Sequence, residues 1–232
     1  MKYKLQLFIS HLIISILLVS LIAGFVFFVW YPFPLANAVG VNSIFIMMLI
    51  IDVVLGPLLT FLVAKKGKKT LKMDLITIGI IQIMALFYGV YSISITRPVY
   101  IVYDNIRFDL VQANQIDDSR LHYGQPKYFA VKSPKSDDEN MQRIQKEMET
   151  GISPSLDVQL YEDIKLNKKQ IFNSRRSLKE LEQFNEPKLT QTLLSKHPKA
   201  MGFLPLKTVG LDMIVLIDEQ GEVLKIVDLR PW

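Results

Sequence analysis

The chain has 232 residues, 50% of them hydrophobic, and carries a net charge of +5 at pH 7 with no cysteine. The apolar residues are concentrated between residues 5 and 95, whereas residues 97–232 have the mixed composition of a soluble domain. The excess positive charge also lies before residue 96, so it does not indicate a nucleic-acid surface. The absence of cysteine excludes disulfides, thiol chemistry and Cys-based zinc sites.

The first apolar run, about residues 7–30, exceeds the roughly 20 apolar residues needed to cross a bilayer. Its far end carries an aromatic belt of the kind found at membrane interfaces, formed by Phe27, Phe28, Trp30 and Tyr31. His11 lies near the other end and has no neighbouring metal ligands in the sequence. We therefore interpret His11 as an interfacial or helix-packing residue.

A cleaved signal peptide is the alternative to a retained first span. Ala36-Asn37-Ala38 has the small-x-small pattern of a cleavage site. The apolar run is longer than the roughly 7–15 residues of a signal peptide core, so we expect it to remain as a membrane helix.

Two further spans are predicted at about 41–64 and 73–95, separated by a loop with five lysines between residues 65 and 72. Lysine-rich short loops stay in the cytoplasm. With three spans, a cytoplasmic loop at this point places the N-terminus in the cytoplasm and residues 97–232 on the opposite side of the membrane. The sequence therefore predicts a membrane module, residues 1–96, followed by a soluble domain, residues 97–232.

The second span contains a carboxylate, and an acid inside a membrane is a functional candidate by default. Asp52, Gly56 and Thr60 follow one another at intervals of four residues, so they share one helix face. Glycine allows another helix to approach closely, and Pro57 is expected to free the carbonyl of Val53 and to kink the span. Two interpretations remain open, a packing seam with Asp52 hydrogen-bonded inside the bundle and a face that binds a partner.

The third span presents Gly79, Gln82, Leu86 and Gly89 on one face. At the rise of an α-helix, Asp52 lies roughly 17 Å from the outer end of its span and Gln82 roughly 14 Å from the inner end of its own. Because the hydrocarbon core is about 30 Å thick, these depths nearly coincide. We expect a contact between Asp52 and Gln82, and we expect Thr60 and Thr77 to lie at similar depths.

The soluble domain is predicted to be α+β with at least two hairpins. Strands rich in β-branched and aromatic residues are expected at 99–103, 106–111, 212–217 and 222–228, with turns at Asp104-Asn105 and Gly221. Helices are expected at 139–150, which follows a capping box beginning at Ser136, and at 174–185 and 187–196.

No pattern in the sequence indicates an enzyme. There is no phosphate-binding glycine loop, nucleophile elbow or HExxH motif, and His122 and His197 have no partner constellation. No cofactor or metal is expected. A membrane-anchored binding protein is the interpretation that remains.

The chain resembles the type IV pilin accessory protein family, the TfpX/TfpZ (FimB-like) group. The resemblance extends over most of the chain except about residues 115–205. The residues that carry it are Trp30-Tyr31-Pro32 with Pro34, Asp52-Val53-Val54-Leu55-Gly56-Pro57-Leu58-Leu59-Thr60, Lys68-Lys69-Thr70-Leu71-Lys72-Met73-Asp74-Leu75, Arg97-Pro98, Arg107-Phe108-Asp109-Leu110-Val111 and Leu229-Arg230-Pro231-Trp232.

This resemblance implies a bacterial inner-membrane protein with a periplasmic domain that assists pilus assembly or dynamics. Its expected partners are a type IV pilin, other pilus-assembly components and the membrane. Our hypothesis is a chaperone-like factor with a helix-docking groove formed or supported by Asp52, Gly56, Pro57, Thr60 and Gln82, and with an exposed hairpin edge that contacts the pilin head. The alternative is a periplasmic small-molecule-binding membrane protein or transporter accessory subunit.

Overall fold

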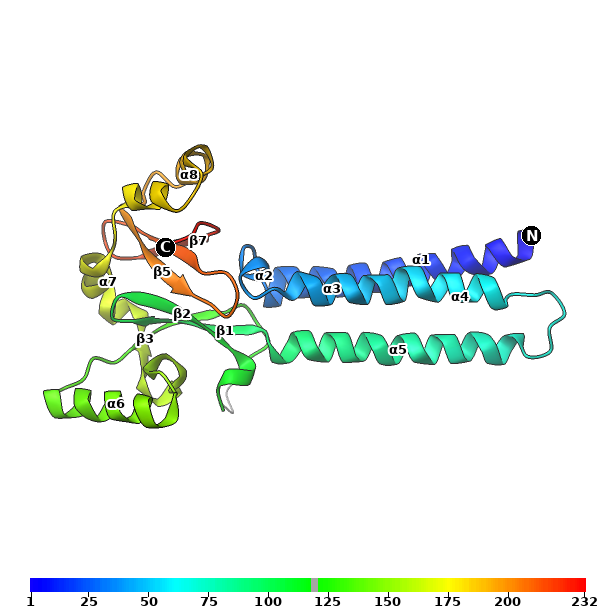
Figure 1. The fold of residues 1–232 in the computed structure, drawn as a ribbon, viewed down its shortest axis with the longest axis horizontal. Coiled ribbons are helices and arrows are strands. Elements are labelled where there is room, and N and C mark those ends of the chain that lie inside the picture. Colours follow the sequence, from blue (N-terminus) through cyan, green and yellow to red (C-terminus); the bar gives the residue numbers. More distant parts are fainter. Residues whose placement is uncertain (118–120) are drawn as a thin grey trace. The chain divides into compact units, whose positions relative to one another are not determined.

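The computed structural model describes residues 1–117 and 121–232, which divide into two compact units (Figure 1). The helical unit comprises Met1–Val29 and Gly40–Thr96, and the sheet unit comprises Trp30–Val39 and Arg97–Trp232. The predicted spans leave residues 31–40 as the connection between the first and the second. In the structure, Trp30–Val39 is part of the sheet unit.

The helical unit contains three helices that are long and apolar enough to cross a membrane, Lys2–Trp30, Val41–Val63 and Leu71–Ile95, as predicted. The first is α1 (Lys2–Phe25) with a terminal π-helical turn (Val26–Trp30), and the third is α5 (Leu71–Ile95). The second consists of α3 (Val41–Leu49), a π-helical turn (Ile50–Leu55) and α4 (Gly56–Val63).

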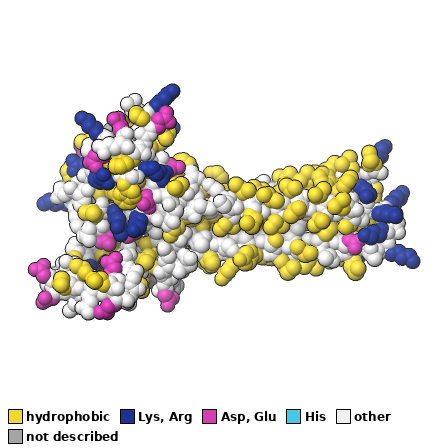
Figure 2. Space-filling model, in the orientation of Figure 1, with side chains coloured by type: hydrophobic (Ala, Val, Ile, Leu, Met, Phe, Trp, Pro, Cys, Tyr) yellow, Lys and Arg dark blue, Asp and Glu magenta, His cyan; other side chains and the backbone are white. Residues whose placement is uncertain are grey.

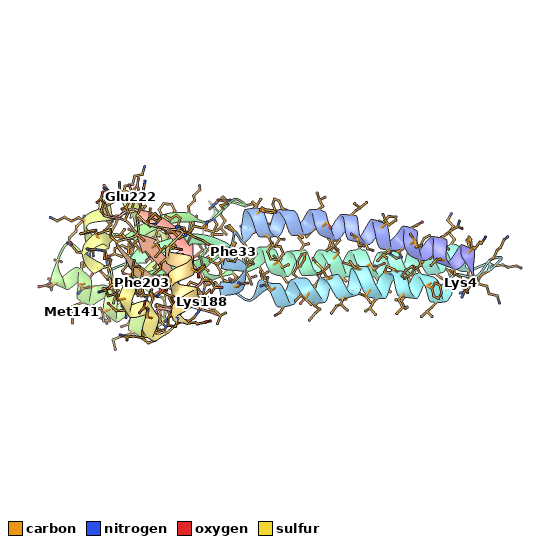
Figure 3. The ribbon with its side chains drawn as sticks, turned by 90° about the horizontal axis from the view of Figure 1, so that it is seen from above. Lys4, Phe33, Met141, Lys188, Phe203 and Glu222 are labelled. Carbon is orange, nitrogen blue, oxygen red and sulfur yellow. The ribbon has the colours of Figure 1, made fainter. Side chains whose placement is uncertain are left out.

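Apolar side chains cover the surface of the three spans, and lysines gather at the end that carries the N-terminus and the lysine-rich loop (Figure 2). Lys4 lies at this end of α1 (Figure 3). Leu21 and Phe87 are 75% and 71% exposed. A surface of this kind suits lipid and not water.

The second span is the centre of the helical unit, because the first and third spans pack mainly against it. Phe8 of α1 meets Phe61 of α4 edge to face at a ring distance of 6.0 Å. On α5, Gly89 admits Met48, whose sulfur would lie 3.0 Å from a β-carbon at that position. Small residues in membrane helices commonly allow such close approach.

Within the described part of the sheet unit, seven strands form one sheet in the order β4-β3-β1-β2-β5-β6-β7. Their bounds are β1 Pro98–Asp104, β2 Arg107–Gln112, β3 Lys127–Val131, β4 Tyr161–Asp163, β5 Gly202–Lys207, β6 Met213–Ile217 and β7 Val223–Val227. Both predicted hairpins are confirmed, since β1 pairs antiparallel with β2 and β6 with β7. Their turns contain Asn105 and Gly221 at φ angles of 55° and 77°.

The longer helices of the sheet unit are α6 (Asp137–Thr150), α7 (Lys168–Ser174) and α8 (Pro187–Leu194). The first matches its prediction, because the Ser136 hydroxyl accepts a bond from the Glu139 amide and Gly151 ends the helix in the left-handed conformation. α8 confirms the helix that was expected to begin at Pro187.

The helix predicted at 174–185 is wrong. Arg176 is extended and exchanges two backbone hydrogen bonds with Phe203 of β5, and only a 3₁₀ segment, Leu178–Gln183, follows. The register of β2 reaches only Leu206 and Lys207 of β5. Arg176 therefore satisfies backbone groups on β5 that β2 does not, and this tertiary pairing overrides the local helical pattern.

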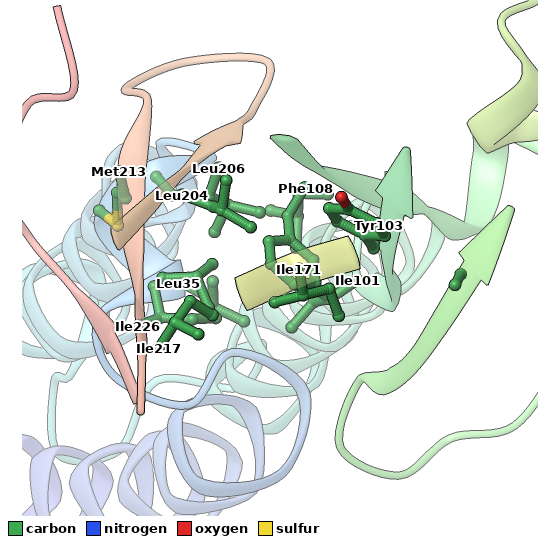
Figure 4. Packing of buried hydrophobic residues seen from close by; sticks show 14 residues of the cluster. Leu35, Ile101, Tyr103, Phe108, Ile171, Leu204, Leu206, Met213, Ile217 and Ile226 are labelled. Atoms are coloured by element: carbon green, nitrogen blue, oxygen red, sulfur yellow. The ribbon is translucent and has the colours of Figure 1, made fainter. Parts of the chain in front are cut away.

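The main core of the sheet unit includes residues from the segment that links the first two spans (Figure 4). Leu35 of α2 (Leu35–Ala38) is 2% exposed and packs in one cluster with Ile101 and Ile226 of the sheet. The Ala38 carbonyl accepts bonds from the Leu211 amide (2.9 Å) and the Thr208 hydroxyl (3.0 Å). Ala36 and Ala38, which suggested a cleavage site, are both buried, and Ala38 belongs to this cluster.

Replacing Leu35 with alanine is expected to destabilise the sheet unit by about 2–5 kcal/mol, because the change leaves a cavity in a closed core. The measurement is denaturant unfolding of the full chain in detergent, followed by tryptophan fluorescence. The matched control is Leu211→Ala. Because Leu211 is 53% exposed, this change should lower the free energy of unfolding only slightly. Equal effects of the two changes would show that the linking segment does not contribute to the core.

Candidate functional site

The π-helical turn in the second span leaves the backbone carbonyl of Asp52 without a donor from its own helix. The Gly56 amide donates to the carbonyl of Ile51. In a regular α-helix it would donate to the carbonyl of Asp52 instead. The next residue, Pro57, has no N–H to donate. The Asp52 carbonyl therefore needs a partner from outside its own helix, and the expected release of the Val53 carbonyl stays a prediction.

Gln82 of α5 supplies the missing donor. Its Nε2 lies 3.1 Å from the Asp52 carbonyl oxygen, which confirms the expected contact between these residues. Gly56 makes this geometry possible, because a β-carbon there would lie 1.9 Å from Gln82 Nε2. Asp52, Gly56, Pro57 and Gln82 thus act together to join the second and third spans.

Thr60 joins the second span to the first. Its side chain is buried, and its hydroxyl lies 2.6 Å from Nδ1 of His11 on α1. This bond agrees with the packing role expected for His11. Thr77 is exposed and donates to the Met73 carbonyl of its own helix, and its expected similar depth to Thr60 stays a prediction.

A cavity of about 200 Å³ lies within the helical unit. α1, the second span and α5 line it with His11, Ile14, Ser15, Leu18, Asp52, Gly79, Gln82, Ile83 and Leu86. Asp52 is only 4% exposed, and neither its Oδ2 atom nor Oε1 of Gln82 has a hydrogen-bond partner in the described chain. Buried acceptors without partners are uncommon and costly.

Of the five residues predicted to form the groove, only Asp52 and Gln82 line this cavity. Gly56, Pro57 and Thr60 are buried beside it in α4, where they support the helix contacts. A docking role for the five residues stays a prediction. Sequence patterns do not indicate that Ile14, Leu18 and Ile83 form the apolar walls, because apolar residues occur on all sides of the spans.

The sheet unit presents an apolar ridge on α6 that sequence analysis did not identify. Met141, Ile144 and Met148 are 66%, 45% and 82% exposed, and Met141 lies near the outer margin of the unit (Figure 3). α6 is held to the unit by polar contacts, among them Arg143 to the Lys132 carbonyl (2.6 Å) and Lys146 to Asp157 (2.7 Å). Met141, Ile144 and Met148 follow one another at intervals of three and four residues, and this spacing could have revealed their shared helix face.

The sheet ends at two edge strands, β4 and β7. β7 belongs to the terminal hairpin, so one of the two predicted hairpins does provide a sheet edge. The β1–β2 hairpin does not, because β3 and β5 flank it. Unpaired backbone groups on an edge strand can bind an added strand.

No group of three His, Asp or Glu side chains among the described residues could hold a metal. Two hollows beside Tyr128 measure about 180 and 260 Å³, below the roughly 300–1,000 Å³ typical of small-molecule sites. Burial raises the pKa of Tyr128 to about 12, so its phenol is neutral at physiological pH.

Comparisons with known proteins give one consistent description. Residues 1–40 match the family model "Fimbrial assembly protein FimB". The chain is similar to three fimbrial assembly proteins of Dichelobacter nodosus: 37% identical over 108 residues for serogroup I, 41% over 101 residues for serogroups C1 and C2, and 40% over 101 residues for serogroup E1. No solved structure matches the chain.

These matches cover 46%, 42% and 42% of this chain, respectively. They span 77% of the serogroup C1 and C2 protein, but only 42% and 39% of the serogroup I and E1 proteins. For the latter two relatives, the similarity therefore involves less than half of the protein.

Gly56→Ala is expected to displace the Gln82 amide and to destabilise the helical unit by about 0.6–2 kcal/mol, the range of hydrogen bonds between membrane helices. Gln82→Ala should cost a similar amount. The double variant should lower the free energy of unfolding by no more than either single variant, because both changes remove the same hydrogen bond. Reversible unfolding in mixed detergent micelles measures all three. Additive effects would show that Gly56 does not act through Gln82.

Proposed function

Because this chain belongs to the fimbrial assembly protein family, we propose that it is an inner-membrane accessory factor that binds a type IV pilin and supports pilus assembly or dynamics. The observation that carries the proposal is the 41% identity to a fimbrial assembly protein of which 77% is matched. The proposed role is that of a chaperone-like binding protein and not that of a catalyst.

The lysine distribution supports an orientation for this role. Lys2 and Lys4 precede the first span, and five lysines lie between the second and third. Positive residues are retained in the cytoplasm. In the proposed orientation the N-terminus is cytoplasmic and the sheet unit is periplasmic, where it can meet the head of a membrane-anchored pilin.

Two kinds of surface support binding of both parts of a pilin. Asp52, Gly56, Pro57, Thr60 and Gln82 would form or support a groove for its membrane helix. The apolar ridge of α6 and the β7 edge offer contacts for its head, since exposed apolar patches and free strand edges are typical interaction sites. Binding at both levels would hold the pilin subunit until it is incorporated.

The orientation can be tested by cysteine labelling, because the natural chain has no cysteine. In intact spheroplasts, Met148→Cys should react with a membrane-impermeant maleimide, because Met148 is 82% exposed on the proposed periplasmic side. Thr70→Cys, in the lysine-rich loop, should react only after lysis. The opposite pattern would reverse the orientation and with it the access of the sheet unit to pilin heads.

Pilin binding can be tested with a photo-reactive amino acid placed at single positions in cells that assemble pili. At Leu86, which lines the cavity, and at Met148 of α6, we expect pilin adducts detected by immunoblot and mass spectrometry. The control position is Phe87, which neighbours Leu86 but does not line the cavity. Adducts with other proteins only, or equal pilin yields at Phe87 and Leu86, would contradict docking in the groove.

A further inference from the structure

Two residues that line the intramembrane cavity each carry a buried oxygen atom with no hydrogen-bond partner among the described residues, Oδ2 of Asp52 and Oε1 of Gln82. The bond from Gln82 Nε2 to the Asp52 carbonyl fixes which end of the amide is occupied, and it leaves the oxygen end without a partner. Carboxylate and amide oxygens both accept hydrogen bonds. Each of these two buried oxygens therefore lacks a donor that it could accept.

The described chain does not supply that donor. His11 Nδ1 is engaged with Thr60, and neither oxygen receives a bond from Ser15, the other hydroxyl residue lining the cavity. The remaining walls are apolar apart from Gly79. In the hydrocarbon core there is little water to satisfy a polar atom, so a partner that brings a donor would gain a bond that lipid cannot offer.

The size of the cavity limits what can fill it. About 200 Å³ is below the roughly 300–1,000 Å³ of small-molecule pockets, and it suits a single inserted side chain better than a separate ligand. Gly79 on α5 has open space where its side chain would be, with no atom within 4 Å of an added β-carbon. A small residue next to a polar one is the usual pattern of a membrane helix contact.

We propose that this cavity receives a hydrogen-bond donor side chain, a hydroxyl or an amine, from a membrane-spanning helix of a partner protein. The partner helix packs against α5 at Gly79, and its donor bonds to Asp52 Oδ2 and Gln82 Oε1. This inference deepens the docking role proposed above and rests on it. It defines the partner by the chemistry of one side chain at mid-membrane depth.

The test uses the full chain in lipid nanodiscs and a fluorescent Leu/Ala probe helix with one central guest residue. Energy transfer measures association for serine, lysine and leucine guests. Serine or lysine probes should bind about 3- to 30-fold more tightly than the leucine probe, as expected from the strength of hydrogen bonds between membrane helices. Asp52→Leu should reduce this preference strongly.

A pair of glycine variants separates blocking of the cavity from general damage. Gly79→Leu places a side chain at the cavity and should lower serine and lysine probe binding to the level of the leucine probe. Gly24→Leu is the matched control, because Gly24 also has open space around an added β-carbon but does not line the cavity. Both variants should keep the melting temperature of the unaltered protein.

Equal binding of the three probes would overturn the proposal and leave the cavity to lipid. Self-association that depends on Asp52 in the absence of probe would also overturn it, in favour of a second copy as occupant. A donor preference without pilin adducts in cells would retain the donor site and remove the proposed pilin role. Pilin adducts without a donor preference would retain the proposed pilin role and remove the donor site.

Discussion

The hydrogen bond from Gln82 to the Asp52 carbonyl is the interaction on which the helical unit depends most. It exists because two features coincide, a π-helical turn that shifts the helix pairing by one residue and a proline that cannot donate at the shifted position. Gly56 provides the space for the amide. A backbone defect in one span is thereby repaired by a side chain of another, and this sets the position of α5 against the second span.

The same arrangement supplies two of the polar residues that line the cavity, Asp52 and Gln82, in addition to His11 and Ser15. The Gln82 amide can donate to the carbonyl only by turning its oxygen elsewhere, and the Asp52 carboxylate lines the same space. Structural and binding roles of these residues are therefore not alternatives. The bond that holds the helices together also orients the acceptors that the proposed partner would use.

The sheet unit depends on a segment that the chain order separates from it. Leu35 and Ala38 lie in its main core, although they occur between the first and second spans. Any movement of this segment must disturb buried apolar contacts and the bonds that the Ala38 carbonyl accepts. The unit is therefore covalently connected to three span ends, after the first, before the second and after the third.

The sequence alone determined the three spans, both hairpins, the capped helix after Ser136 and the contact between Asp52 and Gln82. These follow from continuous apolar length, local turn and capping chemistry, and helix rise, which are properties of neighbouring residues. Tertiary structure decided the π-helical register, the burial of Leu35 and the extended pairing of Arg176 with Phe203. It also decided which apolar residues line the cavity. The burial of Leu35, the pairing of Arg176 and the lining of the cavity each depend on residues far away in the chain, and local patterns do not identify those residues.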